Sequence, residues 1–252
     1  MTVLETCGLS TGYGGAPIVS DISLRFEGGQ LIALAGPNGS GKSTLLKALA
    51  GLLTPMSGDI CLDGRAMSDI APRERAKCMA YMPPDGGSVW PLVARRVVAL
   101  GRAPHLKPLR DLSPEDEVAI ASALDRAGVS HLAERSIDTL SSGERARVML
   151  ARVLATGAGT LLLDEPTAAL DPRHQLAVME TLQAEARRGA LVIIAAHTLN
   201  LVARYCDGVV LLDEGRVFAE GPPDAVLTEI NMAELFGAAP PGGVTGTKWE
   251  MR

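Results

Sequence analysis

Aromatic residues are scarce in this chain of 252 residues, where phenylalanine, tryptophan and tyrosine together make up 3%. Proteins that hold single-stranded nucleic acid stack its bases on such side chains, so the chain has little material for that function. An excess of positive charge is also missing, because the formal net charge is −5. A general nucleic-acid binder needs a basic surface. We therefore expect no nucleic-acid partner.

Long apolar runs and paired cysteines are missing too. The longest apolar run covers residues 190–196, far short of the ~20 residues that cross a bilayer. The first five residues lack the basic and apolar segments of a secretory signal. The scattered cysteines form no C-x-x-C pair, which argues against a disulfide framework or a zinc site. We expect a cytoplasmic protein with free thiols at Cys7, Cys61, Cys78 and Cys206.

The pattern of apolar segments predicts an α/β fold. Strand-length segments alternate with helical patterns, which is typical of a mostly parallel sheet covered by helices. The strand-length segments are residues 30–35, 160–163, 190–196 and 208–212. Three earlier segments, 3–9, 19–26 and 59–62, are joined by glycine turns and predict a smaller antiparallel β layer.

Strand signals disappear between about residues 91 and 154. Helical patterns at 93–100, 114–128 and 141–155 predict a helical subdomain inserted into the α/β core. We expect residues 1–237 to form a single domain and 238–252, which contain Pro240-Pro241-Gly242-Gly243, to form a flexible tail.

The clearest motif follows the apolar run 31–35 and opens a helix. It reads Gly36-Pro37-Asn38-Gly39-Ser40-Gly41-Lys42-Ser43-Thr44 and matches the phosphate-binding pattern G-x-x-x-x-G-K-[ST]. Its glycines allow backbone N–H groups to turn toward a phosphate, and the helix N-terminus adds a positive dipole end. Lys42 would reach the β- and γ-phosphates, and the Ser43 hydroxyl would ligate Mg²⁺. A plain glycine turn is the alternative, but the order of strand, loop and helix favours a P-loop NTPase core.

A second acidic element ends the strand-like run 160–163. Asp164 there would hold Mg²⁺, and Glu165 would orient the water that attacks the γ-phosphate. A solvated turn or a helix cap is the alternative. Farther upstream, Ser141 and Glu144 fit a capping box, and a capped helix N-terminus containing Gly143 is also a good anion site.

These motifs together resemble the nucleotide-binding subunit of ATP-binding-cassette (ABC) transporters along nearly the whole chain. Leu140-Ser141-Ser142-Gly143-Glu144 is similar to that family's signature. The resemblance implies a RecA-like core and two subunits that enclose two ATP molecules head to tail. Ser141 and Gly143 of one subunit would then contact the γ-phosphate held by Lys42 of the other.

The resemblance implies roles for three further residues. Asp171 lies in a segment similar to the family's D-loop, although it also fits an ordinary helix start before Pro172. His197 falls where the family keeps a histidine that contacts the γ-phosphate and the catalytic glutamate. Tyr13 is similar to the aromatic residue that stacks on adenine; a turn residue among glycines is the alternative.

The chain departs from the family pattern at Pro84, where a glutamine is usual. That glutamine contacts Mg²⁺ and the attacking water, whereas proline offers neither a side-chain oxygen nor a backbone N–H. Asp85 could substitute after a shift of one residue. We expect slower hydrolysis or altered coupling. Ser142 replaces a signature glycine, and this small residue still lets phosphate approach.

The stretches 90–105 and 197–227 resemble the ATPases of iron-siderophore, haem and cobalamin importers. This implies an ATP hydrolase that works with ATP and Mg²⁺, as a homodimer, on two transmembrane permease subunits, peripheral on the inner face of the cell membrane. A binding protein would deliver the substrate, and residues 89–105 would shape the contact with the permease. Alternatives are an ATPase of another metal-ion or small-solute importer, a soluble cassette ATPase, and a non-catalytic nucleotide-binding regulator.

Overall fold

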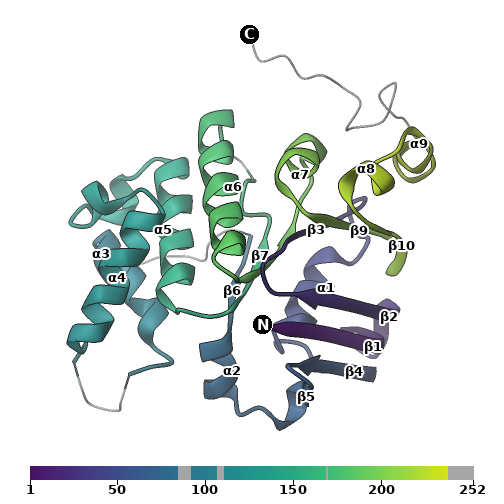
Figure 1. Cartoon of the computed structure of the whole chain (residues 1–252), viewed down its shortest axis with the longest axis horizontal. Helices are drawn as coiled ribbons and strands as arrows, with labels where there is room; N and C mark the ends of the chain where they lie inside the picture. Colours follow the sequence, from purple (N-terminus) through teal and green to yellow (C-terminus); the bar gives the residue numbers. More distant parts are fainter. Residues whose placement is uncertain (85–91, 107–110, 169, 238–252) are drawn as a thin grey trace.

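A computed structural model describes residues 1–84, 92–106, 111–168 and 170–237. Two β-sheets and the helices that cover them make up the described chain (Figure 1). In chain order the elements are β1 (Val3–Tyr13), β2 (Ala16–Glu27), β3 (Leu31–Ala35), α1 (Lys42–Leu49), β4 (Ser57–Leu62), β5 (Arg65–Ala66), η1 (Met67–Asp69), α2 (Pro72–Cys78), β6 (Met79–Met82), α3 (Ala94–Ala99), η2 (Leu100–Arg102), α4 (Pro114–Arg126), η3 (Ser130–Leu132), η4 (Ile137–Thr139), α5 (Ser142–Ala155), β7 (Thr160–Asp164), α6 (Pro172–Arg187), β8 (Leu191–Ala195), α7 (Leu199–Tyr205), β9 (Gly208–Asp213), β10 (Arg216–Gly221), α8 (Pro223–Val226) and α9 (Glu229–Phe236).

The larger sheet confirms the predicted α/β class. Its six strands run in the order β10-β9-β3-β8-β7-β6, and every neighbouring pair is parallel except β9 with β10. Every residue of β3, β7 and β8 is buried, as expected for parallel strands with both faces covered. The four predicted strands of this sheet are all present, within two residues of their expected bounds.

The antiparallel layer is also present, as the sheet β2-β1-β4-β5. Helix α1 contacts strands of both sheets, and one core of buried side chains fills the space around it. A second core lies on the opposite face of the large sheet, beneath helices α3 to α7. The loop that enters α1 is therefore anchored on one side by β3 and on the other by the antiparallel layer.

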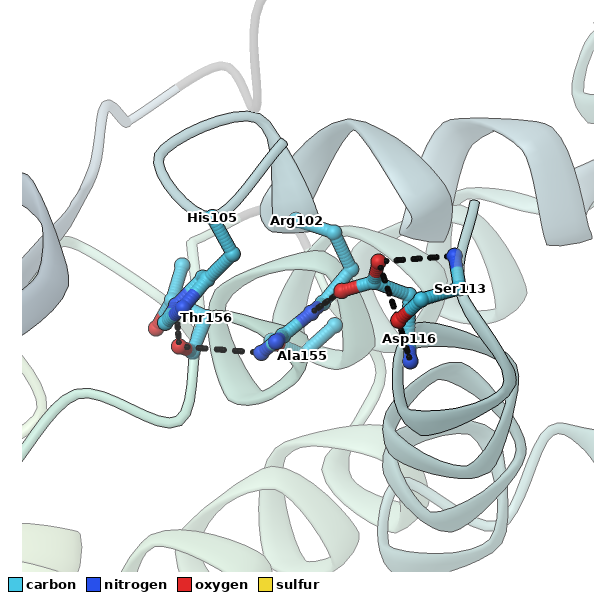
Figure 2. A network of polar contacts seen from close by, with 6 residues as sticks. All are labelled: Arg102, His105, Ser113, Asp116, Ala155 and Thr156. Atoms are coloured by element: carbon cyan, nitrogen blue, oxygen red, sulfur yellow. Dashed lines mark hydrogen bonds and ion pairs between the residues drawn. The ribbon is translucent and has the colours of Figure 1, made fainter. Parts of the chain in front are cut away.

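Three helices, α3, α4 and α5, gather beside the sheets, at the left of Figure 1. Their bounds lie close to those expected from the sequence. A polar network joins their ends: Arg102 forms an ion pair with Asp116 at 2.8 Å and donates to the carbonyl oxygen of Ala155 at 2.9 Å (Figure 2). Because Asp116 also completes a capping box with Ser113, this network fixes the start of α4 against the end of α5.

Three strands were not predicted: β5, β6 and β10. β5 is only two residues long and pairs with β4. β6 is only four residues long, and it is a strand because it pairs in parallel with β7. β10 carries Arg216 and Glu220 and lies at the edge of its sheet, where charged residues are usual. The predicted tail 238–252 lies outside the described residues, and the division into one domain with an inserted helical subdomain stays a prediction. None of the helices described here has both the length and the apolar character needed to cross a bilayer.

Candidate nucleotide-binding site

The loop between β3 and α1 depends on three glycines. Gly36 has φ +143°, and an added Cβ atom there would lie 2.1 Å from the carbonyl oxygen of Leu212. Gly39 and Gly41 have φ +82° and +99°, a backbone region that strains any residue with a side chain. Gly41 also caps α1, so the loop ends at a helix N-terminus, where a phosphate is favoured.

Lys42, the first residue of α1, folds back over this loop. Its Nζ atom donates to the carbonyl oxygens of Gly36 at 2.9 Å and Pro37 at 2.8 Å. The residue is 5% exposed, and this burial lowers the pKa of Lys42, while the charges of Glu165 and Asp164 oppose the shift. The ammonium group is thus held where a polyphosphate in the loop would meet it.

Ser43 and Asp164 come together at the carboxyl end of β7. The Ser43 hydroxyl donates to Oδ1 of Asp164 at 2.8 Å, and the Tyr81 hydroxyl donates to Oδ2 at 3.2 Å. Burial raises the pKa of the fully buried Asp164, while its hydrogen bonds from Ser43 and Tyr81 lower it. Mg²⁺ prefers oxygen ligands and is usually held by one or two protein groups plus substrate phosphates, so this hydroxyl and carboxylate fit such an ion. The described residues hold no group of three or more His, Cys, Asp or Glu side chains arranged as metal ligands.

Glu165 follows Asp164 in a left-handed conformation, with φ +51°. Its N–H donates to the carbonyl oxygen of Ala195, the last residue of β8. Nε2 of His197 lies 2.8 Å from Oε1 of Glu165, so the two expected partners are in contact. A non-glycine residue seldom adopts this backbone conformation, and here it directs an acidic side chain toward the loop.

Lys42, Ser43, Glu165 and His197 share one cavity. Its lining contains most of the residues singled out from the sequence, together with one that sequence reasoning missed, Ile18. The lining residues are Ile18, Asn38, Gly39, Gly41, Lys42, Ser43, Thr44, Glu165 and His197. Ser40 lies beside it, with its hydroxyl 3.5 Å from Nζ of Lys42.

The signature residues lie elsewhere. Ser141 caps α5 in the predicted capping box, accepting from the N–H of Glu144 while the Glu144 carboxylate accepts from the N–H of Ser141. Ser141 lines a separate groove together with Glu144 and His174. Within one chain the structure therefore does not bring the signature to the phosphate loop, as expected for a site completed by a second copy.

His174 was not singled out from the sequence, yet it covers the signature glycine. A Cβ atom added to Gly143 would lie 2.3 Å from Cγ of the His174 ring. Nδ1 of this ring lies 2.8 Å from Oδ2 of Asp171. Asp171 itself caps α6, as the ordinary helix-start alternative predicted.

Tyr13 and Pro84 are both exposed. Tyr13 ends β1 at the turn to β2, with 49% of the residue exposed. Pro84 lies in a turn just after β6. Asp85, the suggested substitute, lies outside the described residues, as do Ala169 of the segment similar to the D-loop and residues 89–91 of the expected permease contact.

Comparison with known proteins identifies the family. A family model for ABC transporters matches residues 19–168. The hemin import ATP-binding protein HmuV of Nocardia farcinica (strain IFM 10152) is 49% identical over 226 residues, covering 89% of this chain and 78% of that protein. The cobalamin import ATP-binding protein BtuD of Halobacterium salinarum (strain ATCC 29341 / DSM 671 / R1) is 39% identical over 236 residues, which cover 93% of this chain and 59% of that protein.

A solved structure supports the same assignment. A metal-chelate type ABC transporter in an inward-facing conformation superposes with a TM-score of 0.82 at 28% identity, covering 94% of this chain and 90% of that chain. The phosphate loop and the match of the family model to more than half of the residues agree with this likeness. The chain belongs to the ABC transporter family, as one of its ATP-binding subunits.

Proposed function

We propose that this chain is the ATP-hydrolysing subunit of a membrane importer and that the importer carries haem. The observation that carries the ATPase assignment is the cavity shared by Lys42, Ser43, Glu165 and His197, where Ser43 is hydrogen-bonded to Asp164. The 49% identity to a hemin import protein supports haem as the cargo. Cobalamin is the second candidate because of the cobalamin import relative. A ferric siderophore is a further candidate, because the sequence also resembles the ATPases of siderophore importers.

The reaction is transfer of the γ-phosphoryl group to water. Lys42 releases loop carbonyls to pair with the β- and γ-phosphates, and the loop N–H groups hold the same oxygens. Ser43 and Asp164 would hold Mg²⁺, which would neutralise phosphate charge. Glu165 orients the attacking water, and His197 fixes the direction of the Glu165 carboxylate through their 2.8 Å contact.

A second copy of the chain completes each site. Ser141 and Gly143 from one copy reach the γ-phosphate bound in the other, while Asp171 links the two sites. The separation of the signature groove from the phosphate cavity within one chain supports this head-to-tail arrangement. Tyr13, exposed at the rim, stacks on adenine. Closing and opening of the dimer on the inner face of the membrane drives two transmembrane subunits, to which a binding protein delivers cargo.

The cargo is tested in source cells in which Lys42→Ala replaces the wild-type chain. We expect uptake of haemin to be lost while uptake of cobalamin and of a ferric siderophore continues, because Lys42 binds the phosphates that energise transport. Re-expression of wild type restores uptake. Loss of cobalamin or siderophore uptake with haemin uptake intact would move the cargo to the candidate whose uptake is lost. If all three continue, the chain does not energise any of these imports.

A further inference from the structure

Tyr81 occupies a position in the sheet that aims it at the metal-binding carboxylate. It lies in β6 directly opposite Leu162 of β7. Because side chains alternate along a strand, Tyr81, Leu162 and Asp164 lie on the same face. That face packs against α1, whose first turn carries Ser43. The parallel pairing of β6 with β7 thus places the Tyr81 hydroxyl beside Asp164.

The two oxygens of Asp164 have different donors. Ser43 donates to Oδ1 and Tyr81 donates to Oδ2. Asp164 is fully buried, and an unsatisfied carboxylate oxygen there would be costly. The pair of donors fixes the plane of the carboxylate.

The position after β6 where a polar side chain is expected holds a proline. Pro84, two residues beyond the end of β6, has no side-chain oxygen and is exposed. Tyr81 is therefore the residue from which β6 directs a polar group at the site.

We propose that Tyr81 is a positioning residue that holds the Asp164 carboxylate in the orientation for Mg²⁺ and so sets the metal affinity of the nucleotide site. This rests on the proposed role of Asp164 as a metal ligand. Groups that hydrogen-bond a metal ligand in this way orient it, and their removal costs about 10- to 100-fold in metal affinity.

The test is Tyr81→Phe, which removes one oxygen and keeps the packed ring. Mn²⁺ is the probe, and its binding to the full chain with ATP present is followed by electron paramagnetic resonance. We expect about 10-fold weaker Mn²⁺ binding or more, with binding of ATP in excess EDTA unchanged. In hydrolysis, the Mg²⁺ concentration for half-maximal rate rises by a similar factor, while the rate at saturating Mg²⁺ falls much less.

Two variants serve as controls. Tyr205→Phe removes the same atom from α7, away from the cavity, and is expected to match wild type. Asp164→Asn is expected to abolish Mn²⁺ binding. Tyr81→Phe with wild-type Mn²⁺ affinity beside an Asp164→Asn variant that has lost it would overturn the role of Tyr81 alone. Wild-type Mn²⁺ binding by Asp164→Asn would overturn the metal site and this inference with it.

Discussion

Replacing Gly143 with alanine tests the contact between the signature helix and α6. Gly143 is the second residue of α5, and its backbone is helical. The added methyl carbon would lie between 2.3 and 2.6 Å from three atoms of the His174 ring, well inside contact distance. The ring must therefore move, and moving it breaks the 2.8 Å contact with Asp171.

The magnitude follows from two opposing terms. Alanine in place of glycine inside a helix stabilises by up to about 1 kcal/mol. Overpacking costs about 1–3 kcal/mol, and the lost hydrogen bond adds about 1 kcal/mol. Gly143→Ala should thus lower the free energy of unfolding by about 1–3 kcal/mol. In a His174→Ala background the clash is absent, so the same change should raise it by about 0.5–1 kcal/mol.

Urea unfolding of the four proteins of this cycle measures the coupling directly. The sign of the Gly143→Ala effect should reverse between the two backgrounds. An equal effect in both would show that His174 does not cover Gly143, and the reasoning would fail. ATPase assays of the same proteins separate two reasons for the glycine. If the variant with both Gly143→Ala and His174→Ala remains inactive, the space beside Gly143 is needed by a phosphate. If activity recovers in this variant, the space is needed only to accommodate the His174 ring.

Three further predictions concern other parts of the chain. Pro84→Gln should raise the basal ATPase rate about tenfold, a barrier change of about 1.4 kcal/mol, by restoring a side-chain oxygen; unchanged basal and transport-coupled rates would contradict this. A hydrogen bond from Arg102 holds the pKa of Asp116 below its usual value. The ion pair therefore stabilises the fold above about pH 4, where the carboxyl group of the unfolded chain is ionised. This stabilisation is lost as the pH falls and Asp116 becomes protonated in the folded protein as well. Asp116→Asn should cost about 3 kcal/mol in urea unfolding at pH 7, and this difference should shrink below pH 4; a constant difference would contradict the assignment. Burial raises the pKa of Cys206 to about 12, so at pH 8 a thiol reagent should label exposed Cys78 and spare Cys206; equal labelling in mass spectrometry would refute its burial.

Local sequence signals were enough where the structure depends on neighbouring residues. The phosphate loop was predicted because an apolar strand, glycines and a helix start follow one another within 36–44. The capping box of Ser141 and Glu144 was predicted for the same reason, since its partners lie one helical turn apart.

Contacts between distant segments were not predictable in this way. Strand β6 is a strand through its pairing with β7, about 80 residues away, and that register is what places Tyr81 against Asp164. The cover of His174 over Gly143 likewise depends on how α6 packs on α5. A sequence pattern with period 2 or 3.6 gives the face of an element but not the element that it meets.

Hydrolysis of ATP by the purified chain with Mg²⁺, compared between wild type and Glu165→Gln, tests the central claim most directly. Size-exclusion chromatography of the same samples follows dimer formation. The account predicts that wild type hydrolyses ATP, and that Glu165→Gln binds ATP, does not hydrolyse it and accumulates as a dimer. In the proposed mechanism Glu165 orients the water and is not needed for phosphate binding. Equal hydrolysis by both proteins would contradict the role of Glu165, and ATP binding without hydrolysis by wild type would contradict an active site completed by two copies of this chain alone.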